Sequence, residues 1–246
     1  MQGMDEAIAC QDRKQAIVNR IFKIVAPRYD FITVALSYGM DRGWKRQLIE
    51  MAKIQSHDTI LDLACGTGDL TFQAVVQAPQ GLVLGLDICL DMLLLAQLRK
   101  HSPPPPVSFL CADIIQLPFP DNSFDLITAG YALRNVSDLR TALTAIYRSL
   151  KPGGRFLSLD FGKPANRHYC RFYLRYLALA GSFWGWLLHR DADVYRYIAI
   201  SLKHYPAQTG VKLLMDQLGF VDTGFQEFLG GAMAINFGSK PAAGSP

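Results

Sequence analysis

The sequence lacks the features of several protein classes. Its five cysteines are an odd number and form no CxxC pair, which argues against a disulfide framework and a structural zinc site. Only 19% of its 246 residues are charged, and a net charge of +4 is too small to indicate a nucleic-acid partner. The N-terminal residues contain no apolar stretch of signal-peptide length. We therefore expect a cytoplasmic location and no nucleic-acid partner.

The sequence also lacks an apolar run long enough to cross a membrane. The most apolar stretch, residues 172–188, is 17 residues long and contains Arg175, so a transmembrane helix is rejected. One interpretation is a buried helix or a hydrophobic lid. The other is a surface that contacts lipid or an apolar substrate, because Trp184 and Trp186 are flanked by basic residues. Peripheral contact with the inner face of a membrane is therefore an expectation.

Half of the residues are hydrophobic, which suits a globular α/β protein with a sizeable core. Apolar runs typical of strands alternate with helical patterns, and this alternation predicts a parallel sheet with helices on both faces. The expected strands are 59–64, 82–87, 107–113, 123–130, 155–161 and two short ones near 220–227 and 232–238. The expected helices are 68–77, 89–100, a segment that begins near Leu139, and a last one that ends at Gly219.

Three segments between or beside these elements complete the predicted organisation. The helix from Leu139 has Asp138 or Ser137 as a cap, and "KPGG" at 151–154 is expected to end it. "PPPP" at 103–106 predicts a rigid surface connection. Residues 162–205 interrupt the alternation, so we expect a lid at the ligand edge of the sheet. The predicted division is an N-terminal helical cover, 1–50, and a domain over 51–246 that contains the lid.

A glycine turn, "LDLACGTGDLTF" at 61–72, follows the first predicted strand. Thr71 stands where a full G-x-G-x-x-G dinucleotide fingerprint has its third glycine. Asp87 ends the second strand, 87 − 66 = 21 residues after Gly66, which is the usual place of an acid that binds ribose hydroxyls. Asp113 ends the third strand, where it could accept the amine of adenine. The pattern indicates an adenosine ligand.

Two acids, Asp62 and Asp69, bracket this turn. Negative charge there disfavours a diphosphate and favours a cationic group, so S-adenosylmethionine is preferred to NAD as the cofactor. The alternative is that both acids only cap turns.

Several longer motifs together resemble the quinone C-methyltransferases, which methylate a polyprenylated ring in ubiquinone, menaquinone and phylloquinone biosynthesis. The motifs are "IFKIVAPRYDFITVALSYGMDRGWKR", "LDLACGTGDL", "LPFPDNSFDLIT", "ALRNVSD", "YRSLKPGGRFLSLDFGKP" and "YRYIAISLKHYPAQ". The resemblance covers about residues 15–240. It implies a class I S-adenosylmethionine-dependent methyltransferase fold, Rossmann-like with a seven-stranded sheet, and a prenylated hydroquinone substrate.

The resemblance and the turn together give the candidate cofactor-binding residues. These are Asp62, Gly66, Thr67, Gly68, Asp87, Ile88, Asp113, Ile114 and Gly130. Gly130 stands where relatives often have serine, and Ala132 stands where glycine often precedes the leucine.

The candidate catalytic residues are Arg134 and Asn135, which follow the fourth strand and should lie at the ligand edge. Arg134 is expected to stabilise a phenolate, directly or by polarising a water, and Asn135 to orient it. Arginine stays protonated, so it is a poor base. Tyr29 of "APRYD" and Tyr197 are the candidate substrate-binding residues. The alternative is that these groups only tether the loop and pack the N-terminus.

The prediction from the sequence is therefore a C-methyltransferase that converts a demethylmenaquinol to a menaquinol, with no metal. The acceptor ring is assigned to a naphthoquinol rather than a benzoquinol on the weaker ground that this acceptor is common in the bacterial family. One alternative is a methyltransferase for another phenolic or lipid acceptor. Another is a catalytically silent adenosine-binding subunit. Assembly into a homo-oligomer is a further expectation.

Overall fold

A computed structural model describes residues 11–99 and 107–244. The prediction for the four prolines at 103–106 lies outside these residues.

Within the described residues, the strands form one seven-stranded sheet in the order β3-β2-β1-β4-β5-β7-β6. The strands are β1 (Thr59–Leu63), β2 (Leu82–Asp87), β3 (Val107–Cys111), β4 (Phe124–Gly130), β5 (Leu150–Phe161), β6 (Val221–Phe228) and β7 (Met233–Ser239). Strands β1 to β5 pair in parallel, whereas β7 runs antiparallel to both β5 and β6. The predicted α/β class is confirmed, and the departure from a purely parallel sheet is confined to the C-terminal hairpin.

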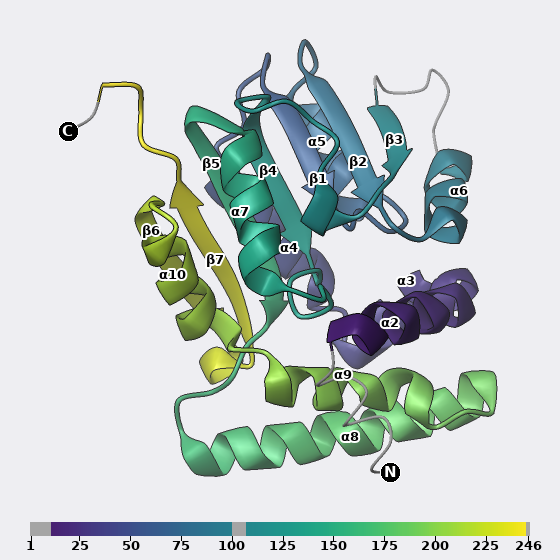
Figure 1. Cartoon of the computed structure of the whole chain (residues 1–246). Helices are drawn as coiled ribbons and strands as arrows, with labels where there is room; N and C mark the ends of the chain where they lie inside the picture. Colours follow the sequence, from purple (N-terminus) through teal and green to yellow (C-terminus); the bar gives the residue numbers. More distant parts are fainter. Residues whose placement is uncertain (1–10, 100–106, 245–246) are drawn as a thin grey trace.

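Two hydrophobic cores lie on the two faces of this sheet, because successive strand residues point to opposite sides. Leu126 and Leu157 belong to one core, and their neighbours Ile127 and Phe156 belong to the other. Helices α4 (Asp41–Ala52) and α5 (Asp69–Gln77) contribute to the first core, and α6 (Leu90–Leu98), α7 (Leu139–Ser149) and α10 (Ala207–Gln217) to the second. Figure 1 shows α7 and α10 in front of the sheet and α4 behind it.

The carboxyl ends of the parallel strands face a separate group of helices. These are α2 (Gln11–Val25), α3 (Tyr29–Leu36), α8 (Arg167–His189) and α9 (Asp193–His204), with a short turn of 3₁₀ helix, Ala26–Arg28, between α2 and α3. In Figure 1 the α8–α9 pair runs across the lower end of the molecule, and α2 and α3 lie between that pair and the sheet. The N-terminal and the inserted helices therefore meet at the edge where open α/β sheets bind their ligands.

The α8–α9 pair is closely packed through two glycines of α8. A Cβ atom on Gly181 would lie 2.7 Å from the carbonyl oxygen of Tyr195, and one on Gly185 would lie 2.5 Å from that of Asp191. Larger side chains at these positions would force the two helices apart.

The apolar stretch 172–188 lies within α8 and is two-sided. Tyr173 and Leu177 are buried with the two glycines, whereas Leu179 and Phe183 are exposed on the opposite side. The side of α8 that packs on α9 agrees with the interpretation as a buried helix. The other side leaves apolar side chains in solvent, as the interpretation as an apolar surface requires. None of the helices in the described part of the chain is both long and apolar enough to cross a membrane.

The segment "KPGG" differs from its prediction. Helix α7, capped by the Asp138 carboxylate, ends at Ser149, and β5 begins at once with Leu150, so residues 151–154 lie inside the strand instead of separating it from the helix. The pairing with β4 shifts register here: Leu150 pairs with Phe124, and Arg155 pairs with Leu126. The extra residues form a bulge, in which Gly153 has a φ of +78°. The strand predicted over 155–161 is therefore longer at its N-terminal end.

Candidate active site

The glycine turn joins β1 to α5 at the carboxyl edge of the sheet. Gly66 and Gly68 have φ angles of +55° and +89°, in the left-handed region that glycine adopts without strain. The backbone N–H of Gly66 donates to Oδ2 of Asp87 at 2.8 Å, and the N–H of Cys89 donates to Oδ1 at 2.8 Å. These two bonds fix the Asp87 carboxylate beside the turn. Burial raises its pKa, although the backbone hydrogen bonds oppose this change.

A cavity lies over this carboxylate and collects most of the predicted cofactor-binding residues. Six of the nine line it: Gly66, Asp87, Ile88, Asp113, Ile114 and Gly130. Each Asp87 oxygen accepts one backbone bond and can accept another, as a pair of ribose hydroxyls requires. The two isoleucines provide apolar walls for a base, with the Asp113 carboxylate beside them. The residues present therefore fit an adenosine group.

The other three predicted cofactor-binding residues, Asp62, Thr67 and Gly68, are not among the residues that line this cavity. Asp62 is 1% exposed and accepts hydrogen bonds from the hydroxyls of Thr71 (2.6 Å) and Thr128 (2.8 Å). Burial raises the pKa of Asp62 to about 6. Thr67 points its hydroxyl at Asp30 of α3, at 2.7 Å.

Asp69 forms ion pairs with Lys45 (2.8 Å) and Arg99 (2.9 Å). Burial alone would raise the pKa of Asp69, but these two cations outweigh it and lower the pKa. The charge of Asp69 is therefore balanced by two cations and no longer supports the electrostatic argument for a cationic cofactor. Asp62 is bound by two hydroxyls and is ionised above about pH 6, so it keeps part of that argument. The case for an adenosine cofactor comes from Asp87, Asp113 and the fold.

A larger cavity of about 420 Å³ lies on the other side of the N-terminal helices, between α3, α8 and α9. Its walls are almost entirely apolar or aromatic. Phe22, Tyr29 and Tyr131 line both cavities, so the two meet at these three side chains. The predicted substrate-binding residues, Tyr29 and Tyr197, both line the larger cavity and are held there by burial among aromatic rings.

Arg134 projects a charge into this apolar cavity. It is 4% exposed, and its Nη1 lies 2.5 Å from Oδ1 of Asp160 at the end of β5. Its Nε is buried and has no hydrogen-bond partner among the described residues. Burial alone would lower the pKa of Arg134, but the Asp160 carboxylate raises it, so the guanidinium remains protonated. The wall of the apolar cavity thus contains a charged guanidinium, one N–H donor of which is buried without a partner among the described residues.

Asn135 lines the cofactor cavity and connects two of the tyrosines. Its amide donates to the carbonyl oxygen of Tyr131 at 2.8 Å, and its Oδ1 accepts from the Tyr197 hydroxyl at 2.7 Å. The loop after β4 therefore places Arg134 towards one cavity and Asn135 towards the other.

Several residues of this site were not predicted from the sequence. Tyr131 directly follows β4, and the argument that placed Arg134 at the ligand edge applies to it equally. Asp160, the partner of Arg134, ends β5 and was detectable in the same way. Asp41 and Lys45 of α4 carry no such signal, because they reach the site only through tertiary packing.

Two histidines of the inserted segment, His168 and His204, do not line either cavity. Among the described residues, no group of three or more His, Cys, Asp or Glu side chains is placed to hold a metal ion.

The family of the chain follows from comparison with known proteins. The model of the ubiE/COQ5 methyltransferase family matches residues 10–240. The chain belongs to this family. The ubiquinone/menaquinone biosynthesis C-methyltransferase UbiE of Cellvibrio japonicus is 40% identical over 233 residues, 94% of each chain. The enzyme of the same name from Proteus mirabilis is 38% identical over 234 residues, 94% of this chain and 93% of its own.

Solved structures agree on the fold. A SAM-dependent methyltransferase from Aquifex aeolicus superposes with a TM-score of 0.57 at 15% identity, over 79% of this chain and 88% of its own. A Haemonchus contortus phosphoethanolamine N-methyltransferase solved with S-adenosyl-L-methionine gives 0.61 at 16% identity, over 81% and 52%. The predicted class I fold, methyltransferase activity and cofactor, S-adenosylmethionine, are confirmed at the level of family and fold.

Proposed function

We propose that this chain transfers the methyl group of S-adenosylmethionine to a ring carbon of a prenylated hydroquinone in quinone biosynthesis. Its relatives from Cellvibrio japonicus and Proteus mirabilis are named as ubiquinone/menaquinone C-methyltransferases and match it over nearly its whole length. The observation that carries the proposal is the junction of the two cavities at Tyr29 and Tyr131, with the guanidinium of Arg134 in the apolar one. A methyl donor and an aromatic acceptor can meet there.

The cofactor supplies an activated methyl group, and the chain supplies its binding site. Asp87 takes the ribose hydroxyls and Asp113 the adenine amine, while Ile88 and Ile114 enclose the base. Tyr29, Tyr131 and the helices around them exclude water from the junction, which strengthens every electrostatic interaction inside it.

Methylation of a ring carbon needs an electron-rich ring, and a hydroquinone becomes richest when one hydroxyl loses its proton. Arg134 stabilises the resulting negative charge through its unpartnered Nε–H. Asp160 holds the guanidinium in place, and Asn135 fixes Tyr131 and Tyr197 around the ring. These groups align the reacting carbon with the methyl group.

The acceptor is assigned to demethylmenaquinol, a naphthoquinol with a prenyl tail. The tail occupies the apolar part of the larger cavity, where each buried methylene contributes about 0.8 kcal/mol to binding. Tyr38, Met40, Phe172 and Leu229 line this cavity and are also exposed, so the cavity reaches the surface beside them. A tail longer than the cavity leaves through this opening.

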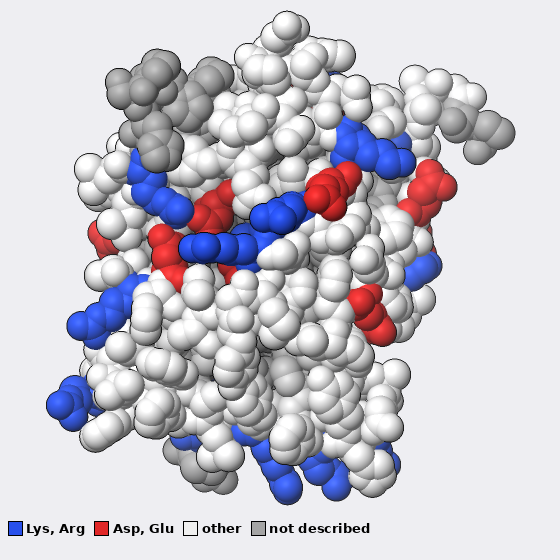
Figure 2. All heavy atoms as spheres, turned by 180° about the vertical axis from the view of Figure 1, so that it is seen from behind, with Lys and Arg blue, Asp and Glu red and all other residues white. Residues whose placement is uncertain are grey.

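The opening lies on an apolar surface, which we assign to contact with a membrane. Leu179, Phe183 and Trp186 continue it along α8. Arg167, Arg171 and Arg175 follow one another at four-residue spacing on the same helix. Figure 2 shows Lys and Arg side chains, and no acidic ones, along the lower edge of the molecule in that view. Apolar side chains beside positive charge suit the surface of an anionic bilayer.

The test is to incubate the protein with S-adenosylmethionine and, separately, a reduced short-tailed demethylmenaquinone or a demethylated ubiquinone-type ring. Mass spectrometry should show a gain of one methyl group on the naphthoquinol. Methylation of the benzoquinol alone would move the acceptor to the ubiquinone series. Cofactor binding without a product from either ring would contradict the proposal and favour another phenolic or lipid acceptor, or a silent subunit.

A further inference from the structure

Tyr131 has an unusual backbone conformation at the junction of the two cavities. It directly follows β4, has a φ of +58°, and is 9% exposed. A bulky residue in the left-handed region is strained, and such strain is concentrated at functional sites. The conformation is held by a hydrogen bond from its N–H to the carbonyl oxygen of Leu159 at 2.7 Å, and by the Asn135 amide on its carbonyl oxygen.

The hydroxyl of Tyr131 meets a buried carboxylate. It donates to Oδ1 of Asp41 at 2.6 Å, and Asp41 is 2% exposed. The other carboxylate oxygen of Asp41 lies 2.8 Å from the ammonium of Lys45, one turn further along α4. Asp41 lines neither the cofactor cavity nor the larger one, so it faces the junction only through Tyr131.

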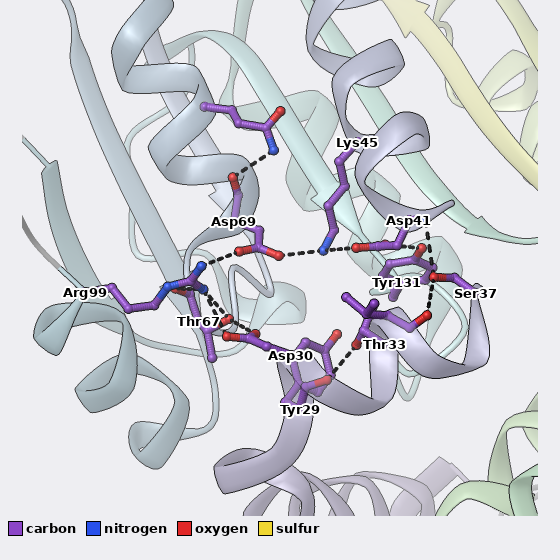
Figure 3. A network of polar contacts seen from close by, with 12 residues as sticks. Tyr29, Asp30, Thr33, Ser37, Asp41, Lys45, Thr67, Asp69, Arg99 and Tyr131 are labelled. Carbon is purple, nitrogen blue, oxygen red and sulfur yellow. Dashed lines mark hydrogen bonds and ion pairs between the residues drawn. The ribbon is translucent and has the colours of Figure 1, made fainter. Parts of the chain in front are cut away.

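From Asp41 a chain of polar contacts leads to the surface, as Figure 3 shows. Lys45 bridges Asp41 and Asp69, Asp69 pairs with Arg99, and Arg99 pairs with Asp30. The last two side chains are 41% and 51% exposed.

Asp41 and Lys45 also line a third cavity, of about 560 Å³, most of whose other lining residues are polar or charged and include Arg42, Arg46 and Asp69. On the face seen in Figure 2, acidic and basic side chains lie side by side in a band across the middle. Thr33 lines both the third cavity and the apolar one. The residue that carries the buried hydroxyl, Tyr131, lines the apolar cavity, and its hydroxyl donates to the carboxylate of Asp41, which lines the third cavity.

C-methylation of a hydroquinone releases one proton from a site that excludes water, and this inference rests on the function proposed above. We propose that Tyr131 and Asp41 form a proton relay that takes the hydroxyl proton of the acceptor ring to the third cavity. Tyr131, which lines both cavities, is the catalytic member. Asp41 acts through it and is the terminal acceptor.

The relay accounts for each bond and proton. The ring hydroxyl gives its proton to Oη of Tyr131 while Tyr131 gives its own proton to Oδ1 of Asp41. The electron pair left on the ring oxygen is delocalised to the ring carbon that forms the bond to the methyl group. The methyl–sulfur bond breaks and leaves its pair on sulfur. The methylated carbon then loses its proton, and the electron pair of that C–H bond restores the aromatic ring. The ring oxygen takes up this proton, and Asp41 releases its own proton to solvent.

Neighbouring groups are poorer acceptors. Arg134 stays protonated. Asp160 lines none of the three cavities, whereas Asp41 lines the third and binds the Tyr131 hydroxyl. Burial raises the pKa of Tyr29 and of Tyr197, which keeps both hydroxyls protonated. Burial and the Asp41 charge raise the pKa of Tyr131 as well, so it passes a proton on without remaining ionised. Among charged groups, Lys45 contacts Asp41 directly, Asp69 is reached through Lys45, and Arg99 through Asp69.

The test uses Tyr131→Phe, which removes only the hydroxyl, and Asp41→Asn, which still accepts the hydrogen bond but takes up no proton. Both should lower kcat by about 10²-fold, as loss of a general base does. The Kd for S-adenosylmethionine and the KM for the acceptor should stay within about threefold. Matched controls are Tyr147→Phe, beside Phe220 on the far face, and Asp58→Asn, a buried acid paired with Arg155. Both should have wild-type kcat.

Chemical rescue separates a proton acceptor from a structural carboxylate. Added formate should restore part of the kcat of Asp41→Ala through the third cavity and none of that of Tyr131→Phe. The relay would be overturned if Tyr131→Phe or Asp41→Asn kept the wild-type kcat. It would also be overturned if formate raised the kcat of Asp41→Ala no more than that of the wild type. Either result would leave the proposed function intact. A wild-type protein that methylates neither ring would instead contradict the proposed function.

Discussion

At the scale of single residues, Arg134 is the group whose surroundings point most directly to its task. A buried guanidinium is stable here only because Asp160 balances its charge at 2.5 Å. That pairing occupies Nη1 and leaves Nε without a partner in the described part of the chain. The arrangement holds a charged guanidinium in the wall of an apolar cavity, where a hydrogen bond to a developing oxyanion is strongest.

Arg134→Lys tests this role without breaking the ion pair. Lysine can keep a charge beside Asp160 but has no second N–H group at the position of Nε. We expect kcat to fall by about 10²-fold or more, the usual effect of losing one oxyanion donor, with an unchanged Kd for S-adenosylmethionine. Arg134→Ala should abolish turnover, and Arg148→Ala, which removes an exposed ion pair, should have no effect. Lost cofactor binding in Arg134→Lys would contradict the assignment.

Asp62 is predicted to make stability depend on pH. Burial raises its pKa from 3.8 to about 6, so the folded state holds a proton more tightly than the unfolded state does. This contribution is fully present below the unfolded pKa and is lost as pH rises through the folded pKa. Asp62→Asn should therefore gain stability relative to wild type between pH 4 and 7, by about 2 to 3 kcal/mol. Urea unfolding at several pH values measures it, and a difference independent of pH would refute it.

The same residue shows why part of the site escaped prediction. Asp87, which ends β2, and Asp113, which lies two residues after β3 instead of ending it, were found because parallel strands end at one edge, whatever the details of packing. Asp62 and Thr67 are adjacent to the turn in sequence, but their side chains bind Thr128 and Asp30, which are 66 and 37 residues away. Nothing local in the sequence specifies such partners.

At the scale of elements, the sequence patterns located strands and helices well and their junctions less well. The apolar runs at 59–64 and 82–87 became β1 and β2 almost without change. "KPGG" has the residues of a helix stop, and α7 does end before it, but pairing with β4 also draws this segment into β5. Residue propensity describes the segment alone, whereas its strand pairing depends on β4, whose Phe124 lies 150 − 124 = 26 residues before its partner Leu150.

Gly181 offers a prediction about the α8–α9 pair. The Cβ of Gly181→Ala would press on the carbonyl of Tyr195, at 2.7 Å, and should separate helices whose tyrosines line the larger cavity. We expect a loss of about 1 to 3 kcal/mol in the free energy of unfolding and a raised KM for the acceptor. Gly43→Ala is the matched control, because nothing lies within 4 Å of its Cβ and α4 should gain up to about 1 kcal/mol. Equal effects of the two changes would contradict close packing at Gly181.

At the scale of the whole molecule, the apolar cavity and the main cluster of charged side chains occupy different regions beside the sheet. The carboxyl edge of the sheet holds the cofactor cavity. The α2–α3 and α8–α9 helices, which lie below that edge in Figure 1, add an apolar cavity. Polar and charged contacts are gathered around the glycine turn and α4. An apolar substrate can thus enter through the apolar opening while a proton leaves through the third cavity.

Membrane contact is the prediction that belongs to the whole molecule. Leu179 and Phe183 are exposed on α8, next to the opening of the larger cavity, but line neither cavity. Replacing both with serine should reduce flotation with anionic liposomes and raise the KM for a long-tailed quinol presented in them. Activity on a short-tailed quinol in solution should not change, because the reacting groups are untouched. Val76→Ser, an equally exposed apolar residue on α5, should float as wild type does. If the wild-type protein does not float with liposomes but is fully active on short-tailed quinols, membrane contact is contradicted. The larger cavity alone would then bind the tail.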